Sequence, residues 1–519
     1  MTDAPRTQKP ADPLFIDEVH GHQARYKKIV AFTHSATKAA GIMLLAAIAA
    51  LVLANTAAHQ VLLEFSHLEV GLAIGDTTYT MGIAHVINDI FMALFFLLVG
   101  LEIKYEMTVG ELTNIRQALL PIIAAVGGVL APVIIYSAIN AGHPDTAGGW
   151  GVPTATDIAF ALGIMALLGS RIPSGIRVFL STLAVADDII AILVIAIFYG
   201  HAPAFEWLLA AAVVLALLVA LNRAHVYALV PYLGLGVVLW LCVYLSGVHS
   251  TIAGVLLAFT IPSGSRVNLQ SFGDWSGKKI RQAKAALNPE EPLVGQKEYI
   301  RNVRSLSAVS RQVIPPATRL ENALYPWVYF LILPLFALTN ADVSISGDIA
   351  SVFGSPAFLG VFFGLLAGKP IGILLASAIV VKTGLAKLPE HVNWRHMVGA
   401  AVLGGVGFTM AIFVANLAYD SEAALTSAKL AILLASAVAG VAGFAILSIE
   451  ARAAAARGVE YVEVAADEDN MQHADREETR QAERMLDRMS ERDCRAYRDA
   501  CVDDEPHELE VTLSDGAAR

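Results

Sequence analysis

Long apolar segments separated by short polar stretches recur along most of this 519-residue chain. Most are about 20 residues long, the length an α-helix needs to cross a hydrocarbon core of about 30 Å at 1.5 Å per residue. The pattern predicts an all-α membrane protein with twelve spans. We place them at 38–58, 82–104, 118–141, 151–169, 176–199, 205–222, 225–245, 248–262, 326–345, 356–381, 396–418 and 426–449.

Composition supports a protein that crosses the bilayer many times. The chain is 56% hydrophobic and 16% charged, with a mean hydropathy of +0.59, whereas a soluble domain has about 25% charged residues. The first apolar run begins near Ala39, behind a polar head, later than the apolar core of a cleavable signal peptide. We therefore expect it to be a retained span.

Basic residues gather in alternate connections between the predicted spans. One set of connections holds Lys104, Arg116, Arg171, Arg177, Arg223, Lys382, Lys387 and Arg395. The opposite set, which includes 141–150, 200–207 and 340–355, has almost none, with Lys429 as the exception. Because cytoplasmic connections are enriched in Lys and Arg, the alternation predicts cytoplasmic termini and supports twelve spans.

The sequence predicts five regions. A polar extension (1–37) precedes spans 1–8 (38–262), and a basic connection (263–325) separates these from spans 9–12 (326–450). The connection holds ten Lys and Arg and is expected to be a solvated linker near anionic headgroups. The tail (451–519) has ten basic and nineteen acidic residues, and its arginines at four-residue spacing favour a solvated helix, with a regulatory role left open.

Two adjacent carboxylates interrupt one span near its middle. Asp187 and Asp188 lie in the run LAVADDIIAILVIAIFYG. A charged side chain at mid-bilayer costs at least about 2.5–3.5 kcal/mol, so such residues are usually functional. Lys369 lies halfway along another span, too far from either surface to snorkel, and it predicts a carboxylate partner among these aspartates.

Two further spans look broken. In GWGVPTATDIAFALG, Pro153, Thr154 and Thr156 interrupt the apolar pattern before Asp157, which either caps the restarted helix or balances charge at an ion site. Asp89, nearer an interface, is interpreted as structural. The second break is the glycine cluster of LGGVGFTMAIF, at Gly404, Gly405 and Gly407.

The two breaks fall in spans 4 and 11. Spans 3–5 and 10–12 would then be inverted repeats, each with its middle helix broken, which is a pattern of transporter sites. Crossed broken helices leave facing dipole ends at mid-membrane. Asp157 would balance the positive N-termini, and Lys369 the negative C-termini.

Seven ordered segments resemble the NhaA sodium/proton antiporters. This family is itself one of the known examples of inverted repeats with broken helices, so the two observations are not independent. The segments cover roughly residues 30–262 and 320–450. They read INDIFMALFFLLVGLEIKYE, PTATDIAFALG, AVADDIIAI, SGVHSTIAGV, YPWVYFLILPLFALTNA, GKPIGI and GGVGFTMAIF.

The resemblance implies exchange of cytoplasmic Na⁺ or Li⁺ for external H⁺ through a twelve-helix fold with a cytoplasmic funnel. The activity would be electrogenic and regulated by pH, in a homodimer in the bacterial cytoplasmic membrane, without enzymatic chemistry, a cofactor or nucleic acid. Ion and proton binding would fall to Asp187 and Asp188, with Lys369 paired to Asp187 and with Asp157 and Thr156 at the crossed helix ends. The pH response would involve Glu102, Glu106, Glu321 and His249.

The chain departs from this family where pH sensing is expected. Tyr105 replaces a basic residue beside Glu102, and Asn322 and Tyr325 follow Glu321 where histidines are common. A sodium-coupled solute symporter is the main alternative, because it shares broken helices and inverted repeats. An intramembrane aspartyl protease would need a Gly-x-Gly-Asp context, which neither Asp157 nor Asp188 has.

Overall fold

A computed structural model of the chain describes residues 30, 32–33, 35–56, 59–74, 77–113, 115–200, 203–265, 267–288, 291–343 and 352–457. Nearly all of the predicted N-terminal extension lies outside these residues, as does the tail from residue 458 on, including its arginine repeat.

Every one of the twelve predicted ranges contains helix. The long or nearly continuous helices are α2 (Ala36–Ala54), α4 (Ile83–His85) with α5 (Met92–Thr108), α6 (Ile115–Ile139), α9 (Ser174–Phe198), α10 (Phe205–Arg223), α15 (Pro316–Trp327) with α16 (Leu333–Asn340), α18 (Pro356–Phe363) with α19 (Lys369–Lys382), and α22 (Glu422–Ala456). The shorter ones are α3 (His59–His67), α7 (Pro144–Ala147), α8 (Ile158–Ala166), α11 (Leu229–Leu245), α12 (Ile252–Thr260), α20 (Trp394–Gly404) and α21 (Phe408–Ala418).

Among the described residues, eight helices are long and apolar enough to cross a membrane, and the bent pair α20–α21 raises the number to nine. The range 151–169 is divided into a 3₁₀ segment η3 (Gly148–Thr154) and α8, while α12 has nine residues and α11 seventeen. The structure thus shows a helical membrane protein, and the count of twelve spans stays a prediction.

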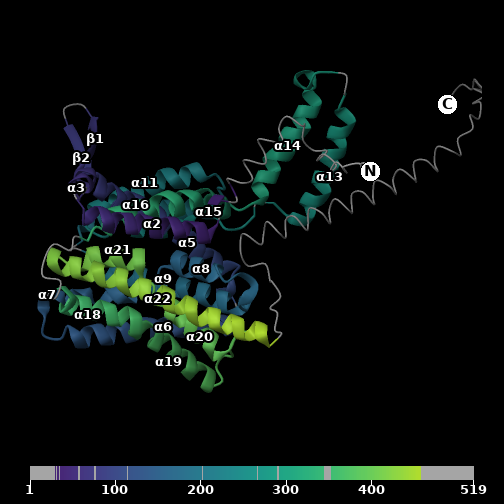
Figure 1. The fold of residues 1–519 in the computed structure, drawn as a ribbon. Helices are drawn as coiled ribbons and strands as arrows, with labels where there is room; N and C mark the ends of the chain where they lie inside the picture. Colours follow the sequence, from purple (N-terminus) through teal and green to yellow (C-terminus); the bar gives the residue numbers. More distant parts are fainter. Residues whose placement is uncertain are drawn as a thin grey trace, which may run out of the picture. The chain divides into compact units, whose positions relative to one another are not determined.

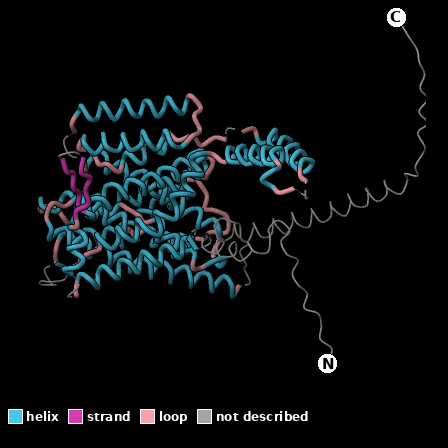
Figure 2. The backbone as a smooth tube through the Cα atoms, turned by 90° about the horizontal axis from the view of Figure 1, so that it is seen from above, coloured by secondary structure: helices cyan, strands magenta, loops and turns pink. Residues whose placement is uncertain are grey.

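Two elements extend from opposite ends of the helix bundle (Figures 1 and 2). One is a hairpin of antiparallel strands β1 (Glu69–Ile74) and β2 (Thr77–Gly82), which an all-α prediction missed. Strands of six residues are too short to stand out in a pattern of apolar segments of about 20 residues. The other is the helix pair α13 (Leu269–Ala286) and α14 (Lys297–Val313), which forms most of the predicted basic connection.

The outward faces of several helices are apolar. Leu209 on α10, Val237 on α11 and Ile197 on α9 are each about two-thirds exposed, at 68%, 66% and 70%. A soluble monomer rarely exposes large contiguous apolar surface, whereas lipid tails solvate it without penalty. The bundle is therefore built with its apolar side chains facing both the interior and the surrounding lipid.

Small residues bring α6 and α19 close together, which positions Lys369 at the first residue of α19. A Cβ atom added at Gly372 would lie 2.8 Å from the Cβ of Ala131, and one at Gly128 would lie 2.9 Å from the Ile373 Cγ1 atom. Real side chains do not approach so closely, so glycine is needed at both positions. In a bilayer such close contact of backbones is a main source of helix association.

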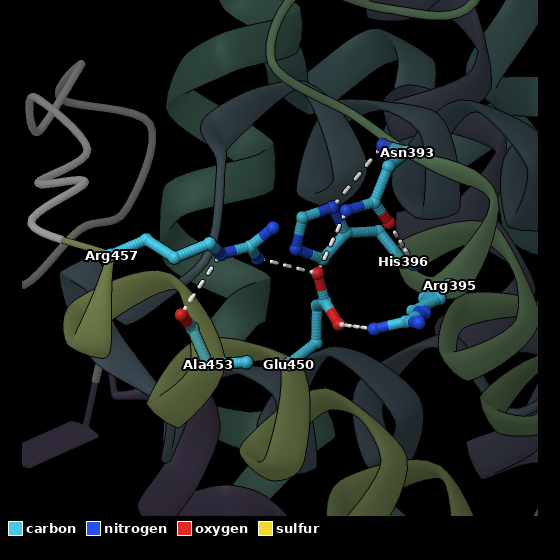
Figure 3. Close-up of polar contacts among 6 residues, drawn as sticks. All are labelled: Asn393, Arg395, His396, Glu450, Ala453 and Arg457. Carbon is cyan, nitrogen blue, oxygen red and sulfur yellow. Dashed lines mark hydrogen bonds and ion pairs between the residues drawn. The ribbon is translucent and has the colours of Figure 1, made fainter.

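A charged cluster fixes the start of α20 to the end of α22 (Figure 3). Glu450, only 3% exposed, accepts from Asn393 Nδ2 at 2.9 Å and pairs with Arg457 at 3.1 Å and Arg395 at 3.4 Å. Asn393 and His396 form a reciprocal capping box at the same helix start. Glu450 therefore holds the first half of the broken span in place.

Replacing Glu450 with Gln should lower the free energy of unfolding by about 1–2 kcal/mol, because a buried carboxylate with three donors loses its charge-assisted bonds. Thermal unfolding in detergent measures the change. The matched control is Glu298→Gln, whose ion pair with Arg301 is exposed on both sides and is expected to contribute almost nothing. Equal midpoints for both variants would contradict the assignment.

Candidate ion-binding site

Helix α9 carries the two aspartates just past its middle. Asp187 and Asp188 are 1% and 2% exposed, and Thr182 and Leu183, one turn earlier on α9, are buried as well. Consecutive helical residues point about 100° apart, so the two carboxyl groups share a depth but face different neighbours. This difference in direction separates their contacts.

Asp187 faces Lys369 and Thr156. The Lys369 ammonium lies 2.6 Å from the Asp187 Oδ2 atom, and both side chains are 1% exposed. Lys369 also donates to the Thr156 hydroxyl. That hydroxyl lies 2.6 Å from Asp187 Oδ2 and 3.0 Å from the carbonyl of Gly404, and its single proton serves one acceptor at a time. A buried cation and carboxylate thus satisfy each other, as a low-dielectric site requires.

A π-helical turn precedes Lys369. This turn, η7 (Gly364–Gly368), joins α18 to α19 and places Lys369 and Pro370 at the start of α19. Pro370 tolerates that position because the first residues of a helix need no amide donor. Such wide turns are rare and occur frequently at functional sites.

The two predicted helix breaks contact each other. The amide of Asp157 donates to the Val406 carbonyl at 2.8 Å, which joins the break before α8 to the break before α21. Between α20 and α21 the chain bends by 43°. A Cβ atom at Gly405 would lie 2.6 Å from the Leu365 carbonyl oxygen, so glycine is required where this break meets η7.

Asp157 caps two helices with one carboxylate. Its Oδ1 atom accepts from the amide of Phe160 at 3.0 Å, in the first turn of α8. Its Oδ2 atom accepts from the amide of Thr409 at 3.1 Å, in the first turn of α21, and also from the Thr409 hydroxyl. The positive ends of two facing helices therefore share one negative side chain. Asp157 thus has the predicted capping role, at two helix starts, and its role in charge balance at an ion site stays a prediction.

Asp188, unlike Asp187, forms no ion pair among the described residues. Within the described part of the chain, its Oδ1 atom is buried without a hydrogen-bond partner, as is the Oδ1 atom of Asp187. Asp188 interacts electrostatically with Asp187, Glu102, Lys369 and Asp157. A buried carboxylate oxygen with unused lone pairs is suited to bind a proton or a small hard cation.

The residues predicted for the pH response fall into two places. Glu102, half-buried on α5, lies within electrostatic range of Asp188, and Glu106 follows one turn later. His249 bonds the Tyr199 carbonyl at 2.6 Å and lies near Asp89. Since Asp89 and Glu102 are thirteen residues apart, about 20 Å of helix at 1.5 Å per residue separates the two places. Glu321 is half-buried on α15, a helix that packs against α5.

Sequence reasoning missed several polar residues around these helices. Thr409 donates its amide and its hydroxyl to Asp157. Its position two residues after Gly407 is the sequence feature that could have indicated this role. Asn88, Asn340 and Asn416 form a linked group, with the Asn416 amide 2.7 Å from Asn340 Oδ1 and the Asn340 amide 2.8 Å from Asn88 Oδ1. Single asparagines on three distant segments carry no pattern that would have joined them. Asp89 accepts from Ser250 at 3.3 Å in the same region.

The ion site has an oxygen-rich composition. No group of three or more His, Cys, Asp and Glu side chains suited to a metal ion occurs in the ranges that the structure describes. The carboxylates of Asp187, Glu102 and Asp157 interact electrostatically with Asp188, and the Thr156 hydroxyl lies 2.6 Å from the Asp187 Oδ2 atom. Oxygen ligands of this kind suit hard cations.

The comparison with known proteins identifies the family of the chain. The family described as Na⁺/H⁺ antiporter 1 matches residues 30–447. The chain belongs to this antiporter family. The Na⁺/H⁺ antiporter NhaA of Wolinella succinogenes is 43% identical over 422 residues, which cover 81% of this chain and 93% of the relative. NhaA of Oleidesulfovibrio alaskensis is 43% identical over 79% of this chain and 91% of its own length, and NhaA of Helicobacter pylori strain HPAG1 is 43% identical over 80% and 94%. Like these antiporters, the chain is a transporter with many membrane-crossing helices rather than an enzyme.

Replacing Asp157 with Ala should cost about 2–4 kcal/mol of unfolding free energy, because two helix N-termini lose their acceptor at once. Asp157→Asn should cost less, since one amide oxygen still accepts on one side. Asn268→Ala provides the control, because Asn268 caps only the exposed helix α13. Thermal unfolding in detergent ranks the three variants, and a cost for Asp157→Ala no larger than that for Asn268→Ala would contradict the shared cap.

Proposed function

We propose that this antiporter exchanges cytoplasmic Na⁺, or Li⁺, for external H⁺ through competition at Asp188 and Asp187. The observation that carries the proposal is the buried, incompletely hydrogen-bonded Asp188 carboxyl beside the Asp187–Lys369 ion pair. One site of this kind holds either protons or a hard cation. Binding of one ligand therefore displaces the other, which is the requirement for exchange.

In the proposed cycle, Asp188 binds Na⁺ and a proton, and the Asp187–Lys369 pair binds the second proton. When the site opens to the cytoplasm, Na⁺ binds at Asp188 and two protons leave, one from Asp188 and one from the Asp187–Lys369 pair. When the site opens outward, Na⁺ leaves and two protons return. Each turnover then moves one net positive charge inward, so exchange is electrogenic.

Alternating access requires that the loaded site reach one face at a time. We propose the twelve-span arrangement for this purpose, with spans 3–5 and 10–12 as inverted repeats whose broken helices cross at the site. The contact between Asp157 and Val406 supports such a crossing. The basic connections support cytoplasmic termini, and the bacterial relatives support location in the cytoplasmic membrane, where we propose a homodimer.

Regulation by pH is part of the proposal. Glu102 interacts electrostatically with Asp188. Glu106 lies on the same helix α5, and Glu321 lies on the neighbouring helix α15. His249 lies at the other end of α5, with Asp89. Changes at the two places are therefore expected to act on different openings of the pathway.

Replacing Asp188 with Asn should abolish exchange while the protein is still produced and inserted, because the amide neither releases a proton nor carries the charge that binds Na⁺. Proton efflux driven by added Na⁺ in everted membrane vesicles, followed with a pH-sensitive dye, measures the effect. Asp145→Asn, at an exposed aspartate, is the control and should keep wild-type exchange. Normal exchange by the Asp188 variant would refute the assignment, and a need for added organic solute would favour a symporter.

Exchange in proteoliposomes should respond to membrane voltage. With two protons for each Na⁺, an inside-negative potential set by K⁺ and valinomycin should accelerate Na⁺ efflux from the lumen when outside protons enter in exchange. Clamping the potential to zero at the same ion gradients should remove the acceleration. A rate independent of voltage would indicate one proton for each Na⁺.

A further inference from the structure

A buried tyrosine links Glu102 to the ion site. Tyr329 lies on the π-helical turn η6 (Val328–Ile332), between α15 and α16, and is 7% exposed. Its hydroxyl donates to the Glu102 Oε1 atom at 3.4 Å. In the sequence Tyr329 lies within the segment YPWVYFLILPLFALTNA and has no predicted role of its own.

The surroundings of this hydroxyl distinguish it from an interfacial tyrosine. Besides its hydrogen bond to Glu102, Tyr329 interacts electrostatically with Asp157 and Asp188. Asp188 in turn interacts with Glu102. Glu102, Asp157 and Asp188 are carboxylates, which repel one another when they are charged. The Tyr329 hydroxyl is a hydrogen-bond donor among them and therefore stabilises the charged form of Glu102.

The ring of Tyr329 packs against a second tyrosine ring. The Tyr325 ring, one turn earlier on α15, lies 4.4 Å away between centroids at an interplanar angle of 47°. Such contact is worth more than the burial of either ring alone. The ring contact restricts the position of the hydroxyl, whereas Glu102 is a half-buried residue of α5.

We propose that Tyr329 is a positioning residue that holds the Glu102 carboxylate toward Asp188 and so increases the affinity of the site for the entering cation. The inference rests on the proposed function, in which Asp188 binds Na⁺. A negative charge fixed near a buried cation site attracts the cation more strongly than one that swings into water. The effect acts on binding of Na⁺ and not on the rate of the conformational change.

Tyr329→Phe removes the hydroxyl and keeps the ring, so it isolates the hydrogen bond. The apparent KM for Na⁺ should rise about 3- to 10-fold, the size expected for a hydrogen bond to a charged group that is only partly lost. The maximal exchange rate should stay within about 2-fold of wild type by the same argument. The control is Tyr244→Phe, at a half-exposed tyrosine that stacks on Trp240, and it should leave both parameters unchanged.

A double-mutant cycle tests whether Tyr329 acts through Glu102. Glu102→Gln should raise the KM, and adding Tyr329→Phe to it should produce no further increase. Glu102→Asp, which shortens the carboxylate without altering the tyrosine, should reproduce the Tyr329→Phe effect and serves in its place if that variant is poorly produced. An unchanged KM in Tyr329→Phe, a loss of maximal rate alone, or additive effects in the double variant would overturn the proposal.

The outcome separates this inference from the proposed function. If Asp188→Asn is inactive and Tyr329→Phe is normal, the inference fails and the proposed function stands. If Asp188→Asn exchanges Na⁺ and H⁺ normally, the proposed function fails, whatever Tyr329→Phe does.

Discussion

The rest of the structure depends on the contact between two helix breaks. An unsatisfied amide in a bilayer has no water to bond, so breaking two helices at mid-depth is tolerable only when the freed groups find partners. Asp157 supplies them by accepting from the first turns of α8 and α21 and by donating its own amide to Val406. The same contact brings Thr156 against Gly404 and toward Asp187. One carboxylate thus both permits the breaks and positions the residues beside them.

The neighbouring aspartates show how one helix divides two roles. Asp187 is committed to Lys369 and Thr156 through its Oδ2 atom, whereas Asp188 has electrostatic neighbours but a buried oxygen without a donor in the described chain. The Oδ1 atom of Asp187 is also without a partner in the described chain, but the charge of this carboxylate is balanced by Lys369. Asp188 forms no ion pair among the described residues, so a proton or cation that arrives there gains more free energy. The angle of about 100° between consecutive residues is enough to produce this difference.

Several polar residues inside the helix bundle lie in, or directly after, wide π-helical turns. The turn η1 (Val86–Phe91) contains Asn88 and Asp89, η6 contains Tyr329, and η7 ends directly before Lys369. Each turn is wider than an α-helical turn and so shifts the residues that follow it around the helix axis. Together with the glycines that bring α6 and α19 together, these turns determine which polar groups meet at the middle of the bundle.

The sequence alone determined the membrane class, the positions of the helices, the pair Asp187–Asp188, the buried Lys369 and both helix breaks. These follow from local properties, because hydrophobic length, mid-span charge, proline and glycine clusters are visible along the chain. Contacts between segments hundreds of residues apart were decided only by the tertiary structure: Asp157 with Thr409, Tyr329 with Glu102, and the three asparagines. The β-hairpin and the π-helical turns likewise escaped prediction, since a six-residue strand or one extra residue in a turn leaves the apolar pattern of a span nearly unchanged.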